Sequence, residues 1–161
     1  MEQLVEEYGP RWAPGPYERG TDGPRVIVVG VDTSPTGLRA ASYGAGLARR
    51  QKARLVLVYV AAPSMWVGLA AAAATDLQQQ TFEEEIEQLR SELRYRADEL
   101  GVPITFMVRR GEAFPELQAA ATGLSADMVV VGASEQAGHR LVGSVAARLV
   151  RAATWPVVVV P

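Results

Sequence analysis

The sequence predicts an α/β fold built on an open, doubly wound, parallel sheet with helices on both of its faces. Three observations lead to this prediction. From Arg25 onward, short apolar runs alternate with segments of helical character, which is the order of repeated β-α-β units. The apolar runs are continuous, as expected for strands that helices cover on both faces. The chain of 161 residues has the size of one domain with a substantial core.

Residues 1–24 differ from the rest of the chain because glycines and prolines recur among them. Both residue types interrupt helices and strands, so we expect a flexible N-terminal extension. The alternative is that the rings of Tyr8, Trp12 and Tyr17 dock on a neighbouring surface. The expected organisation is an extension over 1–24 and one folded domain over 25–161.

The folded domain is predicted to follow the order β-α-β-α-β-α-β-α-β. The longest helix shows apolar residues at steps of three and four, which form one helix face, and Gly101 is placed to end it. Pro103 then precedes the next extended run. The predicted strands cover 26–31, 54–60, 104–108, 127–131 and 157–160, and the predicted helices cover 35–50, 81–100, 112–122 and 144–153.

The segment 61–75, AAPSMWVGLAAAAAT, is apolar and helix-prone but lies between the second strand and the longest helix. One interpretation is a lid or an extra helical turn packed on the core. The other is a wall of a ligand pocket or an interface, because Met65, Trp66 and Leu69 would otherwise be exposed. Both interpretations stay open at this point.

Two segments leave strands with chemistry suited to a ligand: GVDTSPTG (30–37) and GASEQAGHRLVGS (132–144). In sheets of this class, ligands bind beyond the carboxyl ends of the strands, where the connection order reverses. Asp32 ends the first strand and could accept hydrogen bonds from a sugar or a base. It could equally cap the following helix, as could Thr33 and Ser34, and on residue type alone a cap is favoured.

The second segment ends in Gly143-Ser144 at a predicted helix start, where free backbone N–H groups stabilise an anion. It is not a P-loop, because no lysine precedes the serine. Arg140 is the one cation of the loop and could meet a phosphate, whereas Glu135 would oppose a polyphosphate. His139 is interpreted as a surface residue of the loop.

Composition excludes several classes of function. The net charge is −2, so bulk charge draws the chain neither to nucleic acid nor to an anionic membrane, and no apolar run has the length of a membrane span. There is no cysteine and one histidine, which argues against thiolate or histidine metal sites and fits a cytoplasmic location. No nucleophile–base pair is apparent, so we expect a binding protein and not an enzyme.

The residues resemble those of the universal stress protein family. The stretches that carry the resemblance are VIVVGVDTSPTGLRAASYGAGLA, RLVLVYV and ADMVVVGAS…GSVAARLVRAATWPVVVVP, and they span residues 25–161 in order. The resemblance implies a fold of the adenine-nucleotide alpha-hydrolase type, with five parallel strands in the order 3-2-1-4-5. It also implies a stress-response regulator that forms a homodimer through the last strand.

The resemblance further implies binding of ATP or another adenine nucleotide, with weak ATP hydrolysis left open. By position, Asp32 and Val60 would contact adenine, and the loop residues would surround ribose and phosphates. The implied cofactor-binding residues are Asp32, Val60, Gly132, Ser134, Gly143 and Ser144.

The loop departs from the family pattern G-x2-G-x9-G-[ST] in two ways. The second glycine is replaced by Glu135, or by Ala133 if the loop is aligned from Gly143, and the span from Gly132 to Gly143 is two residues short. A weakened site for a smaller adenine nucleotide is therefore one hypothesis. A dimeric interaction protein that binds no nucleotide is the other.

Overall fold

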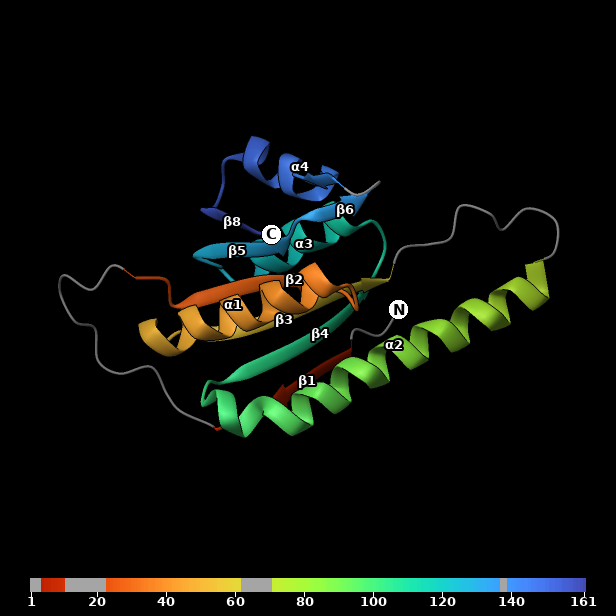
Figure 1. The fold of residues 1–161 in the computed structure, drawn as a ribbon, viewed down its shortest axis with the longest axis horizontal. Helices are drawn as coiled ribbons and strands as arrows, with labels where there is room; N and C mark the ends of the chain where they lie inside the picture. The colour runs from red at the N-terminus through yellow and green to blue at the C-terminus, as the bar shows by residue number, and fades with distance from the viewer. Residues whose placement is uncertain (1–3, 11–22, 62–70, 137–138) are drawn as a thin grey trace.

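A computed structural model describes residues 4–10, 23–61, 71–136 and 139–161 of the chain (Figure 1). One sheet runs through the middle, in the order β1-β4-β3-β2-β5-β8, and a small hairpin, β6–β7, lies apart from it. The strands are β1 (Leu4–Tyr8), β2 (Val26–Val31), β3 (Arg54–Ala61), β4 (Ile104–Arg110), β5 (Met128–Gly132), β6 (Ser134–Gln136), β7 (His139–Leu141) and β8 (Val157–Val160). The helices are α1 (Pro35–Gln51), α2 (Ala71–Leu100), α3 (Ala113–Gly123) and α4 (Ser144–Ala152).

The core lies in two layers, one on each face of the sheet. Along β2, Ile27 and Val29 pack with residues of α1 and α2, whereas Val28 packs with residues of α3 and α4. The same alternation holds along β3, where Leu57 faces the first layer and Val58 the second. The apolar runs are continuous because successive side chains enter opposite layers and both layers are apolar. The predicted doubly wound architecture is confirmed.

The predicted order of the five parallel strands is confirmed, and the predicted strand number is wrong. Strands β4, β3, β2, β5 and β8 are neighbours in that order and are all parallel. Strand β1 adds a sixth strand, antiparallel to β4, with Leu4 opposite Val108 and Tyr8 opposite Ile104.

The prediction of a flexible extension is therefore wrong for residues 4–8. The physical reason is the alternation in LVEEY, which turns Glu6 and Tyr8 toward α2. There the Arg90 guanidinium binds the Glu6 carboxylate at 2.6 Å, and Tyr8 packs against the core. The alternative interpretation, that Tyr8 docks on a neighbouring surface, holds. Trp12 and Tyr17 lie outside the described residues.

Two further elements differ from the prediction. Helix α2 begins at Ala71, ten residues before the predicted start at Thr81, and its N-terminal part reaches past the end of the sheet (Figure 1). Most of the segment 61–75, from residue 62 to residue 70, lies outside the described residues, so the choice between lid and wall is untested. The predicted glycine loop at 132–144 contains the hairpin β6–β7.

Across the described ranges, no helix has both the length and the apolar character that a membrane crossing requires.

Candidate functional site

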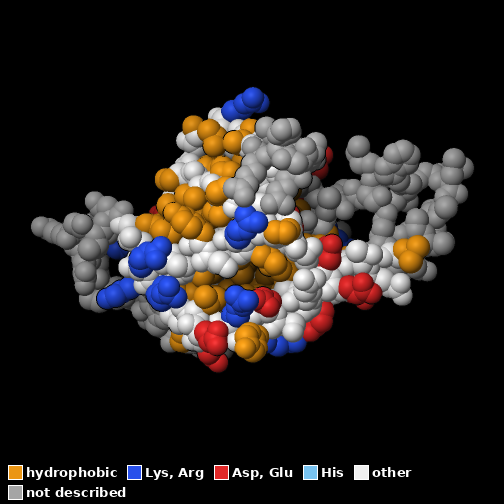
Figure 2. Space-filling model, in the orientation of Figure 1, with side chains coloured by type: hydrophobic (Ala, Val, Ile, Leu, Met, Phe, Trp, Pro, Cys, Tyr) orange, Lys and Arg blue, Asp and Glu red, His pale blue; other side chains and the backbone are white. Residues whose placement is uncertain are grey.

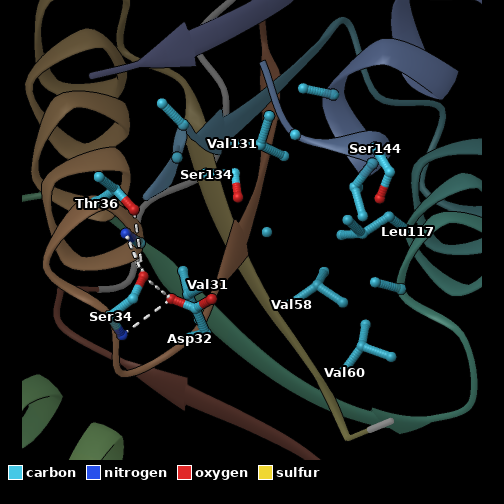
Figure 3. A pocket seen from close by; sticks show the side chains of 18 residues that line it. Val31, Asp32, Ser34, Thr36, Val58, Val60, Leu117, Val131, Ser134 and Ser144 are labelled. Atoms are coloured by element: carbon cyan, nitrogen blue, oxygen red, sulfur yellow. Dashed lines mark hydrogen bonds between the residues drawn. The ribbon is translucent and has the colours of Figure 1, made fainter. Parts of the chain in front are cut away.

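A cleft of about 540 Å³ opens at the carboxyl ends of β2, β3 and β5, where α1 leaves on one face of the sheet and α4 begins on the other (Figure 3). This is the switch point at which α/β sheets of this class hold ligands, and the volume lies in the range of small-molecule sites. The cleft is lined by Gly30, Val31, Asp32, Ser34, Thr36, Gly37, Val58, Val60, Ala113, Leu117, Val131, Gly132, Ala133, Ser134, Gly143, Ser144, Val145 and Ala146. All six residues implied by the family resemblance are among them.

Asp32 is held in place by the first turn of α1. Ser34 is the N-cap, and its Oγ accepts a hydrogen bond from the Gly37 N–H at 3.0 Å. The Ser34 N–H donates to Asp32 Oδ1 at 3.0 Å, and the Ser34 hydroxyl donates to the same oxygen. The capping role considered for Asp32 therefore belongs to Ser34. Asp32 orients the cap with one oxygen, and its second oxygen points toward the middle of the cleft (Figure 3).

Two glycines let the backbone close around this carboxylate. A Cβ at Gly37 would lie 2.1 Å from Asp32 Oδ1, so only glycine leaves room for the carboxylate there. A Cβ at Gly132 would lie 2.6 Å from the carbonyl carbon of Thr36 and 2.9 Å from the Gly37 nitrogen. The end of β5 therefore lies directly against the first turn of α1, and Gly132 forms the floor between Asp32 and α4.

The other wall of the cleft is the start of α4. Gly143 is the N-cap and makes no side-chain capping hydrogen bond, so no side chain of the described residues caps the first amides of α4. Such amides and the helix dipole favour an anion. The hydroxyl groups of Ser134 and Ser144 lie on this wall (Figure 3).

The lower wall of the cleft is apolar. Val58 and Val60 of β3 and Leu117 of α3 lie side by side there (Figure 3). On the neighbouring strand β4, Arg109 is the register partner of Val60. Its Nε–H donates to the Glu116 carboxylate of α3 at 2.6 Å. Gly111 permits this pair, because a Cβ there would lie 2.9 Å from Glu116 Cγ. The ion pair fixes α3 against β4 and so fixes the apolar wall.

A buried tyrosine lies on the α2 side of the same strand ends. Tyr59 is 5% exposed, and its hydroxyl donates to the Glu85 carboxylate of α2. Burial raises the pKa of the Tyr59 phenol well above its usual range, and the Glu85 and Asp32 carboxylates raise it further. Through this hydrogen bond the neutral phenol links α2 to β3, next to the cleft residue Val60.

Sequence reasoning missed the residues that reach the cleft from α3. Ala113 and Leu117 line it because the crossover from β4 to β5 carries α3 over β3 and β2. These residues can be assigned to the cleft only when the strand order is known, because the strand order determines where α3 lies. Thr36 is also part of the lining; it is buried, and its Oγ1 lies 3.3 Å from Ser34 Oγ.

The remaining loop residues are located by their backbone. In the hairpin, Glu135 lies opposite Arg140 and Gln136 opposite His139. Within the part of the chain that the structure describes, no group of three or more His, Asp or Glu side chains is arranged to hold a metal ion.

Comparison with known proteins identifies the family. The profile of the Universal stress protein family matches residues 24–161. A universal stress protein of Methanocaldococcus jannaschii is 32% identical over 138 residues, which cover 84% of this chain and 81% of that protein.

Solved structures share the fold. The universal stress protein UspA of Lactobacillus plantarum matches with a TM-score of 0.70 at 22% identity, covering 84% of this chain and 97% of that one. A universal stress protein in complex with cAMP matches with a TM-score of 0.57 at 24% identity, covering 86% and 98%. A family protein of Arabidopsis thaliana with AMP bound matches with a TM-score of 0.58 at 17% identity, covering 85% and 91%. The chain belongs to the universal stress protein family.

Proposed function

We propose that this universal stress protein is a regulatory protein that binds an adenine nucleotide in the cleft at the carboxyl ends of β2, β3 and β5. The observation that carries the proposal is the convergence of three different chemistries in one cleft. An apolar wall, a fixed carboxylate and a helix start without a side-chain cap lie around one space. These correspond to the base, the ribose or base edge, and the phosphate of a nucleotide.

The apolar wall and Asp32 account for the base and sugar. Val58, Val60 and Leu117 offer a surface on which a planar base can be buried. Asp32 offers a carboxylate oxygen to hydroxyl or amino donors, and hydrogen bonds to a charged acceptor are stronger than those to a neutral one. The start of α4, with Ser144, offers amides and a hydroxyl to a phosphate.

The relatives support the same ligand class. One matched universal stress protein is a complex with cAMP, and one from Arabidopsis thaliana has AMP bound. Both ligands combine adenine, ribose and one phosphate. We extend this ligand class to the present chain as part of the proposal, together with a cytoplasmic location.

The proposal is for binding without strong catalysis. Among the described lining residues, Asp32 is the one ionisable side chain, and one of its oxygens is occupied by Ser34. Phosphate transfer to water needs a positioned base or metal together with charge stabilisation. We expect phosphate release from ATP to stay at the rate of the buffer alone.

Calorimetric titration of the purified chain with AMP, cyclic AMP, ADP and ATP tests the proposal. Asp32→Ala is expected to weaken binding at least tenfold, because it removes the acceptor and loosens the Ser34 cap. Gly143→Asp is expected to abolish binding, because a carboxylate would occupy the anion site. Asp98→Asn, an exposed acid on α2, is the control and is expected to bind normally. Absence of heat with every nucleotide at millimolar concentration contradicts the proposal.

The second candidate is a dimeric interaction protein that binds no nucleotide, and the exposed edge at β8 favours it. Strand β8 pairs with β5 on one side, and Val157, Val158 and Val159 are half-buried. Val150 of α4 is 55% exposed, and apolar side chains gather over this part of the molecule (Figure 2). A protein that is dimeric and yet gives no heat with any nucleotide would support this candidate.

A further inference from the structure

Helix α1 exposes a face that carries positive charge and no negative charge. Its sequence, PTGLRAASYGAGLARRQ, holds three arginines and no Asp or Glu. Arg39, Tyr43 and Arg50 are exposed and follow one another at helical steps of four and seven, so they share one face, and Gly46 lies between them. Arg49 adjoins Arg50 at the end of the helix. We call these five residues the basic face of α1, and Figure 2 shows Lys and Arg side chains gathered over the C-terminal end of α1.

The charges of the basic face are not neutralised by the described part of the chain. Within those ranges Arg49 and Arg50 form no ion pair, whereas the arginines of α2 all bind glutamates of α2 or β1. Arg39 donates to the Pro161 carbonyl at 2.8 Å, which holds its side chain in place. The helix dipole accounts for part of this placement, because it favours cations at a helix C-terminus. It does not account for Tyr43, which is 46% exposed and lies about two turns before the helix ends.

Of the three glycines of α1, Gly46 is the one that packing against the described residues does not require. Gly37 and Gly44 are required, because a Cβ there would lie 2.1 and 2.6 Å from side-chain atoms of the segment 29–32. A Cβ at Gly46 would meet only the Arg50 guanidinium, at 3.5 Å or more, which is an ordinary contact. Glycine weakens a helix relative to alanine, so its presence on the outward face indicates that something outside the chain approaches the backbone closely there.

We infer that the basic face of α1 docks an acidic segment of a partner protein, with carboxylates on the arginines and an apolar side chain against Tyr43 and Gly46. Guanidinium groups bind carboxylates through paired hydrogen bonds. Tyrosine and arginine are also the residue types that contribute most to binding at protein interfaces. From Arg39 to Arg50 the face is about 16 Å long, which about three turns of a partner helix would span. The surface is separate from the cleft, because none of its five residues lines the cleft.

Charge favours an acidic protein segment over the other occupants of such a face. In a twofold contact between two copies of the chain, the same surface meets itself, so arginines would face arginines. Nucleic acid is a long polyanion, and the net charge of −2 opposes its attraction to the chain as a whole. A short acidic segment responds mainly to charges within the Debye length, about 10 Å at 0.1 M salt, and near α1 these are positive.

A labelled peptide tests the inference on the full chain by fluorescence anisotropy. The probe is a helical peptide of about 16 residues with glutamates along one face around a central leucine, and its control carries glutamine in place of every glutamate. At low ionic strength the acidic peptide is expected to bind with micromolar affinity, at least tenfold more tightly than the glutamine peptide. Equal affinities of the two peptides, or no binding of the acidic peptide at about 0.1 mM, overturn the inference.

Matched charge variants locate the bound peptide. Arg50→Gln is expected to weaken binding of the acidic peptide at least fivefold, because it removes a guanidinium that faces the carboxylates. Arg151→Gln removes an exposed arginine from the last turn of α4 and changes the net charge equally, and it is expected to leave the affinity unchanged. Equal losses in the two variants would show a response to net charge alone and overturn the placement on α1.

Gly46→Ala separates a binding role of this glycine from a structural one. The variant is expected to raise the melting temperature by about a degree or more, because alanine is the better helix former. It is also expected to weaken peptide binding at least threefold, because the methyl group stands where the partner approaches. A lower melting temperature would show that the fold itself requires the glycine. That result, or unchanged peptide affinity, overturns the close approach at Gly46.

Two further measurements distinguish the other occupants. A single-stranded DNA of the same formal charge that binds more tightly than the peptide, with the same dependence on Arg50, would identify nucleic acid as the occupant. A homodimer whose dissociation constant changes at least tenfold in Arg50→Gln, measured by analytical ultracentrifugation, would identify a second copy. Either result overturns the inference, and peptide binding that depends on Arg50 without either result supports it.

Discussion

At Gly132, the absence of a Cβ atom determines the shape of the cleft. This residue ends β5, and its Cα lies so close to the first turn of α1 that the backbone of Thr36 occupies the place of a side chain. Asp32 depends on the same approach, because its carboxylate fills the space beside Gly37. The close packing of β5 against α1 therefore requires glycine at positions 37 and 132. Larger residues there are expected to change both the free energy of unfolding and the affinity for a ligand.

Gly132→Ala is expected to lower the free energy of unfolding by roughly 1–3 kcal/mol, because a methyl group would have to displace backbone atoms and not a flexible side chain. Denaturant unfolding followed by circular dichroism measures the change. Gly123→Ala is the matched control, since no atom lies within 4 Å of a Cβ there. It is expected to be neutral or slightly stabilising. Equal losses in the two variants would contradict the close-approach argument.

Tyr59 makes stability depend on pH in the alkaline range. Because the fold raises the pKa of this phenol, the folded chain favours its neutral form. That contribution is complete below the unfolded pKa, near 10, and is lost as the pH rises through the folded pKa. Tyr59→Phe is expected to lower the free energy of unfolding by about 1 kcal/mol at pH 8.

The variant is also expected to lose less stability than the wild type between about pH 10 and 11, where an unfolded tyrosine ionises. Urea unfolding at matched pH values measures both curves, and the other titrating groups are common to the two proteins. Parallel curves for the wild type and Tyr59→Phe would show that the Tyr59 phenol does not couple to stability.

At the scale of elements, the sequence predicted those strands and helices that a local pattern of apolar residues determines. Continuous apolar runs identify the parallel strands, and the apolar face of residues 81–100 identifies most of α2. Strand β1 was missed because a segment rich in glycine and proline directly follows LVEEY. Its stability comes from pairing with β4, in which Val108 lies opposite Leu4 and Ile104 opposite Tyr8. Long-range pairing of this kind leaves no local periodicity.

The candidate site was predictable to the same extent. The two segments that begin at the ends of β2 and β5 could be identified from sequence, because strand ends meet at one edge of a parallel sheet. The family resemblance then supplied the individual residues, such as Asp32 and Gly132, and both line the cleft. The α3 residues Ala113 and Leu117 could not, since they reach the cleft through the path of a crossover. The hairpin β6–β7 could not either, because Glu135 and Arg140 pair by register and carry no alternating apolar pattern.

Strand β1 gives a prediction at this scale. Tyr8→Ala is expected to lower the melting temperature by several degrees, because Tyr8 packs against the core beneath α2. Val5→Ala is the control on the same strand, since Val5 is 49% exposed. It is expected to change the melting temperature by about a degree or less. Equal melting temperatures for the wild type and Tyr8→Ala would show that β1 contributes no stability in solution.

At the scale of the whole molecule, the two edges of the sheet are different surfaces. The Val129 N–H donates to the Pro156 carbonyl, and the Ala133 N–H donates to the Val160 carbonyl. Alternate residues of a parallel strand face opposite neighbours, so the backbone groups of Val157 and Val159 point to the outer edge of β8. This edge is apolar in its side chains and suits pairing with a second copy of the chain.

Val159→Pro is expected to raise the dissociation constant of such a dimer at least tenfold, because it removes an outward N–H while leaving the β5 ladder intact. Analytical ultracentrifugation over a concentration series measures it. Val158→Pro is the contrasting variant, since it removes an N–H that faces β5, and it is expected to lower the melting temperature. A dimer of unchanged affinity in folded Val159→Pro would exclude pairing through β8.

The charged strand at the opposite edge has a consequence for how far assembly can proceed. Strand β1 carries Glu6 and Glu7, and these engage Arg90 and Arg54 of its own chain. A short edge strand covered by charged side chains is a poor template for pairing with another strand. Two chains joined at β8 would therefore present only β1 strands at both outer ends, and polymerisation would stop at two. In a dimer of this kind, the N-terminal strand would keep a self-pairing sheet finite.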